Sequence, residues 1–210
     1  MTREQFKQAA GLTDALADRW YEPFMQTCHE FMIDTLTRQA CFLAQIGTES
    51  GGFTQLIESF NYSVKGLVIF GPRLTAEQRA TLGRKPGEPS LPQERQRAIA
   101  NLVYGGRLGN SHPDDGWTYR GRGLKQITFK ANYQACGKAL GLDLLANPDL
   151  LLLESNAARS AGWFWQEHHL SKFADRGDFT GMTKAINGGL NGLEDRLARL
   201  QVARKALGLA

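Results

Sequence analysis

Apolar residues recur at helical spacing along most of this 210-residue chain, and this periodicity limits the fold more than any other feature. Phe24, Cys28 and Phe31 share one helical face, and the leucines between 193 and 200 share another. Alternation typical of a strand is convincing only in a short stretch near residues 123–128. The sequence therefore predicts a mainly α fold, α+β only through this minor β element.

Capping residues and glycines mark the expected helix ends. The pairs Thr2–Gln5 and Thr75–Gln78 have the sequence signature of a capping box. We expect Pro23 in the first turn of a helix, where its missing N–H is tolerated. Another helix should end close to Glu49, because Gly51–Gly52 begins two residues later and glycine terminates helices.

The middle of the chain differs from the rest in its proline content. Five of the seven prolines lie between residues 63 and 113. A bare loop of that length would be unusual in a compact domain. We therefore expect one discontinuous domain over residues 1–210, with 1–62 and 114–210 as the main helical lobe and 63–113 as a smaller inserted lobe.

Charge and composition exclude several classes of protein. The net charge of +4 comes without an uninterrupted Lys/Arg block, so we do not expect a nucleic-acid partner. The longest leucine run has four residues, far short of a membrane span, so no membrane insertion is expected. The four histidines lack metal-ligand spacing, and we expect no metal and no cofactor. The three scattered cysteines are expected to be reduced core thiols.

Glycine is enriched, with 23 in 210 residues, and nine of these glycines lie within three polar clusters. The first cluster, residues 47–53, holds Glu49 at an expected helix end, and Glu58 follows nine positions later. Two carboxylates flanking a bond are what glycoside hydrolysis needs. One protonates the leaving oxygen, and the other activates water or attacks the sugar. The spacing alone would equally suit two ordinary surface acids.

The second cluster, residues 116–133, interleaves glycine with aromatic, Arg and amide side chains. Aromatic rings stack on sugar faces, and guanidinium and amide groups bond hydroxyl and acetamido groups. The same mixture could bind single-stranded nucleic acid. The third cluster, residues 186–192, could simply be a loop at a helix C-terminus. For a carbohydrate ligand the expected contacts in the second cluster are Trp117, Tyr119, Arg122 and Tyr133.

Taken together, the three clusters resemble glycoside hydrolase family 19. Glu49, the segment Arg122–Tyr133, and Asn187 with Arg196 follow the order and approximate spacing of that family. The resemblance covers roughly residues 36–200 and is closer to the phage and prophage endolysin branch than to secreted plant chitinases. It implies a lysozyme-like helical domain in which the small inserted lobe helps to form a substrate groove.

The resemblance also implies roles for individual residues. Glu49 matches the general acid and Glu58 the general base, while Thr128 stands where the family holds the attacking water. Thr48 precedes Glu49 where a His is common, and the family's disulfides are missing. The implied mechanism is inverting, with Glu49 kept protonated by partial burial and by repulsion from Glu58. Further implied substrate contacts are Gln126, Asn187, Arg196 and Tyr62.

The function expected from this resemblance is that of a monomeric endolysin that cleaves β-1,4 bonds in peptidoglycan glycan strands. It would accumulate in the host cytoplasm, leave with the help of a separate holin, and act on the cell wall in the periplasm. Two alternatives stay open at this point. One is a chitinase acting on N-acetylglucosamine polymers, and the other is a glycan-binding module without catalysis.

Overall fold

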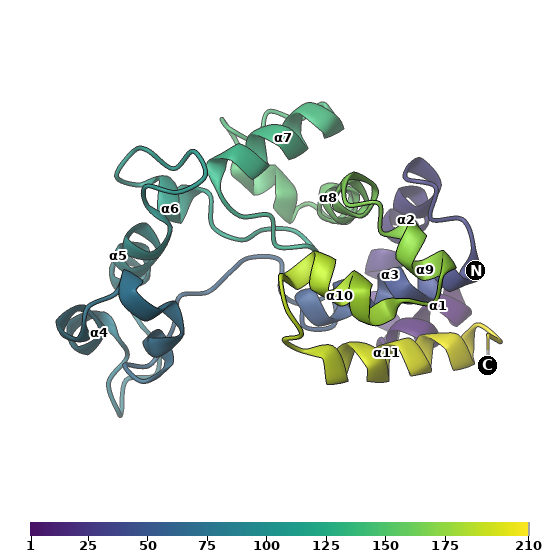
Figure 1. The fold of residues 1–210 in the computed structure, drawn as a ribbon, viewed down its shortest axis with the longest axis horizontal. Coiled ribbons are helices and arrows are strands. Elements are labelled where there is room, and N and C mark those ends of the chain that lie inside the picture. Colours follow the sequence, from purple (N-terminus) through teal and green to yellow (C-terminus); the bar gives the residue numbers. More distant parts are fainter. Residues whose placement is uncertain (210) are drawn as a thin grey trace.

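The computed structural model describes residues 1–209, and helices dominate this part of the chain (Figure 1). The α-helices are α1 (Arg3–Ala10), α2 (Asp14–Glu30), α3 (Leu36–Glu49), α4 (Ala76–Leu82), α5 (Gln93–Tyr104), α6 (Asp115–Thr118), α7 (Lys130–Leu140), α8 (Glu154–Glu167), α9 (Ser171–Asp175), α10 (Phe179–Asn187) and α11 (Leu193–Ala206). Two 3-10 helices are η1 (Gly66–Arg73) and η2 (Pro148–Leu152). The prediction of a mainly α fold is confirmed.

The helix ends follow the capping signals with one exception. Both capping boxes, Thr2–Gln5 and Thr75–Gln78, form in full. Pro23, however, lies inside α2 and not in its first turn, because the helix begins at Asp14 behind a Thr13 cap. The apolar face extends upstream of the proline, and its burial offsets the backbone hydrogen bond that a mid-helix proline removes.

The main hydrophobic core surrounds α3. Residues 39–47 of this helix are all buried, which is typical of a helix covered on every side. Helix α11 packs on α3, and α8 packs on α2. The latter approach is close, because a β-carbon at Gly162 would lie 2.3 Å from the Phe31 ring. Glu49, at the last position of α3, is therefore carried by a helix that is buried on every side along most of its length.

A second hydrophobic core lies in the part of the chain where we expected the inserted lobe. It gathers side chains from η1, α5 and the segments around them, with Trp117 at its edge: Phe60, Leu67, Leu74, Leu91, Ile99, Ala100 and Val103. Figure 1 shows η1, α4, α5 and α6 as a separate mass at one end of the molecule. Two irregular stretches, near residues 53–60 and 119–128, cross between this mass and the main lobe.

The expected strand near residues 123–128 does not form as a continuous element. Among the described residues, pairing in this region is limited to isolated bridges, Ile57 with Arg122 and Arg122 with Ile127. No helix in residues 1–209 has the length and apolar character needed to cross a bilayer. Cys28, Cys41 and Cys136 are buried and unpaired, as predicted, and burial raises the pKa of the Cys41 thiol to about 11.

Candidate active site

Glu49 is fixed by the sharp turn that ends α3. Gly51 and Gly52 have left-handed backbones, with φ of 55° and 71°, a conformation that favours glycine. The Gly52 N–H donates to the Gly47 carbonyl at 2.7 Å, which satisfies a carbonyl in the last turn of the helix. Phe53 then enters the core and is fully buried. The chain cannot carry Glu49 far from this position without unpacking Phe53.

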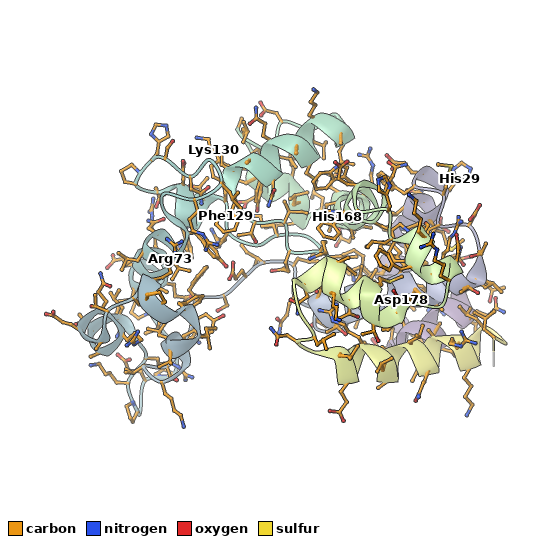
Figure 2. The ribbon with its side chains drawn as sticks, in the orientation of Figure 1. His29, Arg73, Phe129, Lys130, His168 and Asp178 are labelled. Atoms are coloured by element: carbon orange, nitrogen blue, oxygen red, sulfur yellow. The ribbon has the colours of Figure 1, made fainter. Side chains whose placement is uncertain are left out.

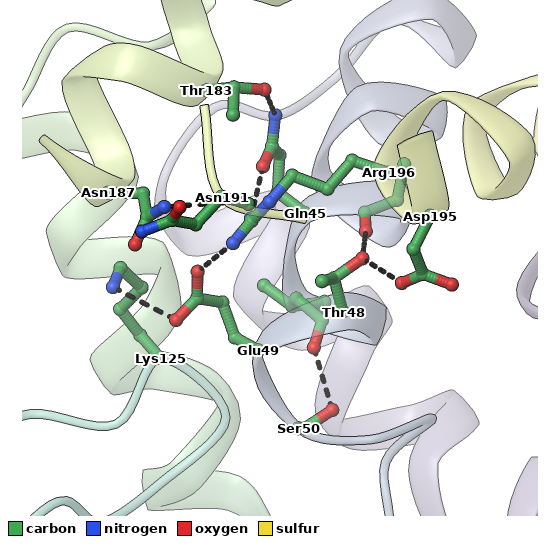
Figure 3. Close-up of polar contacts among 12 residues, drawn as sticks. Gln45, Thr48, Glu49, Ser50, Lys125, Thr183, Asn187, Asn191, Asp195 and Arg196 are labelled. Atoms are coloured by element: carbon green, nitrogen blue, oxygen red, sulfur yellow. Dashed lines mark hydrogen bonds and ion pairs between the residues drawn. The ribbon is translucent and has the colours of Figure 1, made fainter. Parts of the chain in front are cut away.

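Two cations hold the Glu49 carboxylate (Figure 3). Arg196 Nη2 donates to it at 2.5 Å, and Lys125 Nζ lies 3.4 Å away. The Arg196 side chain is only 4% exposed, and its Nη1 donates to Gln45 Oε1 at 2.6 Å. Gln45 in turn donates to Thr183 at 3.1 Å. We expected repulsion from Glu58 at this carboxylate, and the contacts that the structure gives it are with two positive partners, Arg196 and Lys125.

Glu58 lies in a row of three residues that crosses the connection between the lobes. The antiparallel bridges Ile57–Arg122 and Arg122–Ile127 align three short pieces of chain. In the adjacent row, this register places Glu58, Gly121 and Thr128 side by side. Alternate residues point to opposite faces, so this row faces away from the bridged row. Since neighbouring strands lie about 4.8 Å apart, the Glu58 and Thr128 backbones are about 9–10 Å apart.

Gly121, at the centre of this row, leaves the space between its neighbours open. A β-carbon at this position would lie 2.8 Å from Gln126 Oε1 and 3.3 Å from Glu58 Oε2. The Gln126 amide and the Glu58 carboxylate therefore converge on the same point above the Gly121 backbone. Thr128 donates its hydroxyl hydrogen to the Gln126 carbonyl at 3.0 Å, so its oxygen can only accept a further hydrogen bond.

The electrostatic surroundings of Glu58 differ from those of Glu49. Burial raises the pKa of Glu58, and the Gly121 N–H, the Tyr104 hydroxyl and the Arg120 charge oppose this rise. Tyr104 donates to Glu58 Oε1 at 2.7 Å, and the Gly121 N–H donates to Oε2 at 3.0 Å. Burial lowers the pKa of Arg120 to about 10, which leaves it a cation at neutral pH. The two hydrogen bonds and the Arg120 charge partly replace the hydration that the buried Glu58 carboxylate has lost.

Replacing Tyr104 with Phe tests this compensation. The variant removes a donor that lowers the pKa of Glu58, so this pKa rises. If Glu58 must be ionised for activity, the acidic limb of the pH–rate profile moves to higher pH. Activity at neutral pH should fall about tenfold, as expected for a lost hydrogen bond to a charged group. The measurement is the pH dependence of hydrolysis by both proteins.

The matched control for Tyr104→Phe is Tyr119→Phe. Tyr119 also loses a hydrogen bond in this variant, to the Leu145 carbonyl at 3.2 Å, but it is buried away from Glu58. This control should be about 1 kcal/mol less stable, without a shift of the acidic limb. An unchanged limb in Tyr104→Phe as well would show that the Tyr104 hydroxyl does not tune Glu58.

A hollow of about 230 Å³ adjoins Thr128 and Gln126, and it combines aromatic walls with amide groups. Phe129 and His168, labelled in Figure 2, come from the start of α7 and the end of α8. Leu108, Gln126 and Phe129 all have positive φ, an uncommon and costly conformation for such residues. Strain of this kind concentrates at functional sites. The hollow is lined by Leu108, Lys125, Gln126, Ile127, Thr128, Phe129, Asn132, Trp163, Phe164 and His168.

Three expected substrate contacts lie behind the site and not in it. Tyr119, Arg122 and Tyr133 are 6%, 3% and 0% exposed. Arg122 belongs to the bridged row, which faces the protein interior. Its guanidinium donates to the Thr118 carbonyl at 2.7 Å and to the Tyr133 hydroxyl at 3.0 Å, and it pairs with Asp149. The prediction of direct substrate contact is wrong for these residues, which instead hold the loop that carries Gly121.

The remaining expected contacts are closer to the surface. Trp117 is half-buried, and the Arg120 guanidinium covers one face of its ring at 3.7 Å, so only the other face could meet a sugar. Tyr62 is also half-buried, and burial followed by the charge of Glu58 raises its pKa. Asn187 is exposed and donates to the Asn191 carbonyl at 3.2 Å, beside the Glu49 network in Figure 3.

Three residues that contribute to the site had no role in the sequence analysis. Lys125 pairs with Glu49, Tyr104 bonds Glu58, and Arg120 places a charge beside Glu58. Lys125 and Arg120 belong to the glycine-rich cluster 116–133. Their position in that cluster could have identified them as candidate partners of the carboxylates. Tyr104 ends a helix 46 positions from Glu58, and only the packing of the second core brings the two together. No group of three or more His, Cys, Asp or Glu in residues 1–209 is arranged to hold a metal ion.

Known sequences are similar to this chain over both long and short stretches. A family model described as "Chitinase class I" matches residues 96–192. A Haemophilus influenzae protein named "Glycosyl hydrolase family 19 domain-containing protein" is 41% identical over 171 residues, or 76% of this chain and 74% of that protein. "Endochitinase 1" of Theobroma cacao is 51% identical over 51 residues, which span 24% of this chain and only 16% of the plant enzyme.

Chitinases of solved structure share this fold. Chitinase C from Streptomyces griseus superposes with a TM-score of 0.63 at 20% identity, over 99% of this chain and 76% of that one. A bacterial family 19 chitinase gives a TM-score of 0.63 at 23% identity, over 100% of this chain and 95% of that one. At this level of identity, the superpositions establish the shared fold.

Proposed function

This chain belongs to glycoside hydrolase family 19 and has its mainly α, lysozyme-like fold, and from that premise we propose that it is a phage-type endolysin. As a family member it is a glycoside hydrolase related to chitinases. The proposed substrate is bacterial peptidoglycan, cleaved at the β-1,4 bonds of its glycan strands to lyse the host cell. Two carboxylates that both contact the loop 119–128, Glu49 at Lys125 and Glu58 at Gly121, support the reaction. The distribution of charge supports the substrate.

The distribution of charge is strongly uneven. Residues 63–113 contain eight Lys and Arg but only three Glu, a net charge of +5. The whole chain has a net charge of +4, so the remaining residues together carry −1. Chitin is uncharged, whereas peptidoglycan carries carboxylates on its peptide stems. A basic lobe beside a neutral one favours an anionic polymer. This observation carries the choice of peptidoglycan.

In the proposed mechanism, Glu58 is the base. A water molecule that donates one hydrogen to Thr128 and the other to Glu58 keeps a lone pair free for attack on the sugar. Gln126, whose amide reaches the open space above Gly121, would orient the sugar or its acetamido group. Attack from this side, opposite the leaving oxygen, inverts the configuration of the anomeric carbon.

Glu49 would act as the acid on the leaving oxygen, and its partners suggest how the sugar reaches it. Lys125 lies 3.4 Å from Glu49 and 4.5 Å from the centre of the Phe164 ring, which lines the hollow. A sugar that stacks on Phe164 would displace Lys125. The carboxylate would then be free on this side to meet the leaving oxygen, while Arg196 would keep the side chain in place.

Product analysis on two polymers tests the proposed function. The protein is incubated with purified peptidoglycan and with colloidal chitin, and the new reducing ends are identified by mass spectrometry. The proposal requires muramic-acid reducing ends from peptidoglycan, with the α-anomer formed first. Release of products from chitin alone would instead establish the chitinase alternative, which the names of the relatives favour. Binding of either polymer without any cleavage would leave the glycan-binding alternative.

The proposed biological setting follows from the same function. The enzyme would accumulate in the host cytoplasm as a monomer, pass through lesions made by a separate holin, and reach the wall in the periplasm. The three buried, unpaired cysteines are compatible with folding in a reducing compartment. Cofractionation of the protein with host cytosol before lysis, and with the wall afterwards, would support this setting.

A further inference from the structure

Most of the positive charge of segment 63–113 has no carboxylate partner. Two of its cations are paired, Arg95 with Glu88 and Arg97 with Asp114. The other six form no ion pair with any residue in the described part of the chain: Lys65, Arg73, Arg79, Arg84, Lys85 and Arg107. Unpaired like charges repel each other in the folded protein, so their concentration in one small lobe favours the binding of an anion.

Three of these six cations line a single hollow of about 370 Å³, which lies apart from both carboxylates of the candidate active site. Lys65, Arg84 and Lys85 contribute the positive charge. Glu88 is the one acidic residue in its wall, and its carboxylate is already held by Arg95 and by the Lys85 backbone N–H at 2.6 Å. The hollow therefore keeps the excess charge of its three cations.

The local backbone builds this hollow and holds Arg84 in it. Ser63 and Arg84 form a parallel bridge, and the Arg84 N–H donates to the Tyr62 carbonyl at 2.9 Å. Gly83 makes this approach feasible, since a β-carbon there would lie only 2.6 Å from the Val64 backbone. The position of Arg84 is thus set by main-chain contacts and does not depend on a ligand.

The Arg84 guanidinium has donors to spare. Its Nη1 makes only long contacts, 3.4 Å to the Glu88 carbonyl and 3.5 Å to the Pro89 carbonyl. Its Nε is buried and has no hydrogen-bond partner in the described structure. A buried donor without a partner is unfavourable, so this guanidinium is not fully satisfied by the protein itself. The Lys85 ammonium donates to the Ala80 carbonyl of α4 at 2.6 Å, a neutral partner that leaves its charge uncompensated.

We propose that this hollow is a phosphate-binding site through which the inserted segment holds phosphate groups of the cell envelope. A guanidinium with two ammonium groups suits the several oxygens and the negative charge of a phosphate. The volume exceeds that of one phosphate, so part of the molecule that carries it would enter as well. The site is independent of the proposed function, because it would bind its ligand whichever glycan the enzyme cleaves.

Titration with inorganic phosphate tests the site directly. Binding by the intact protein is measured by NMR chemical-shift changes against chloride at equal ionic strength. The double variant Lys65→Gln/Lys85→Gln should bind at least tenfold more weakly. The control Arg73→Gln/Lys138→Gln removes the same charge outside the hollow, with Arg73 exposed on the same lobe (Figure 2), and should change binding less than twofold. Equal weakening in both variants, or no binding by the unaltered protein, would overturn the proposal.

Two further arms identify where the phosphate comes from. The same proteins are mixed with a soluble polyol-phosphate polymer and with vesicles of phosphatidylcholine and phosphatidylglycerol at 3:1. The proposal is supported if the double variant loses binding to one of these probes and the control keeps it. The probe concerned then identifies the source of the phosphate. If the double variant binds both probes as well as the unaltered protein does, the proposal of an envelope ligand is overturned. Arg84→Lys, which keeps the charge but not the fork of donors, should weaken phosphate binding without unfolding the protein.

Discussion

Glu49→Gln is expected to lower the rate of glycan hydrolysis about 10³-fold while the protein stays folded, within the range usual for a lost general acid. Gln has the same shape and can still accept the hydrogen bond from Arg196, so the network of Figure 3 should persist. The amide cannot protonate the leaving oxygen. The measurement is the rate of reducing-end release from peptidoglycan, with circular dichroism as the check on folding.

A comparison with Glu58→Gln separates the two roles. On an aryl glycoside with a very good leaving group, which needs no protonation, Glu49→Gln should keep much of its activity while Glu58→Gln stays inactive. The opposite pattern would exchange the acid and the base. The charge-matched control is Glu167→Gln, an exposed residue of α8, which should behave like the unaltered enzyme. Unaltered rates for Glu49→Gln on every substrate would remove Glu49 from the machinery.

Arg196→Met should have the second-largest effect, on stability as well as on activity. The substitution removes the donors to Glu49 and Gln45 from a site where the arginine side chain is 4% exposed. Breaking a buried ion pair on one side typically costs 3–5 kcal/mol, and we expect about 2–4 kcal/mol because Glu49 is partly exposed. Activity should fall at least 100-fold, since Glu49 loses the contact that orients it. Denaturant unfolding and hydrolysis rates measure the two effects.

Two further variants identify the cause of this loss. Arg204→Met changes an exposed arginine of the same helix and should alter the free energy of unfolding by less than about 0.5 kcal/mol. The double variant Glu49→Gln/Arg196→Met should be less unstable than the sum of its parts, because the uncompensated charge is gone. Strict additivity would mean that the Arg196–Glu49 contact does not stabilise the fold.

Local signals predicted the helical architecture well. Capping boxes and apolar stripes act within a few residues of each other, so they can be read from the chain directly. Pro23 shows the limit of such signals, because the preference of proline for the first turn of a helix is weaker than the burial of an apolar helix face. The buried face of α2 extends from Ala17 to Cys28 across the proline, and its burial determined where this helix begins and ends.

The candidate site also combines features that local sequence signals predict with features that depend on tertiary packing. The sequence by itself determined the mainly α class, the end of α3 at Glu49 and the cluster of residues around Gly121, because glycine and helix periodicity act locally. Only the tertiary structure decided that Glu58, Gly121 and Thr128 share a row and that Arg122 faces inward, because a one-residue change in register exchanges the two faces. It also decided the cations around Glu49 and the Tyr104 contact to Glu58, since these depend on packing between helices distant in the chain.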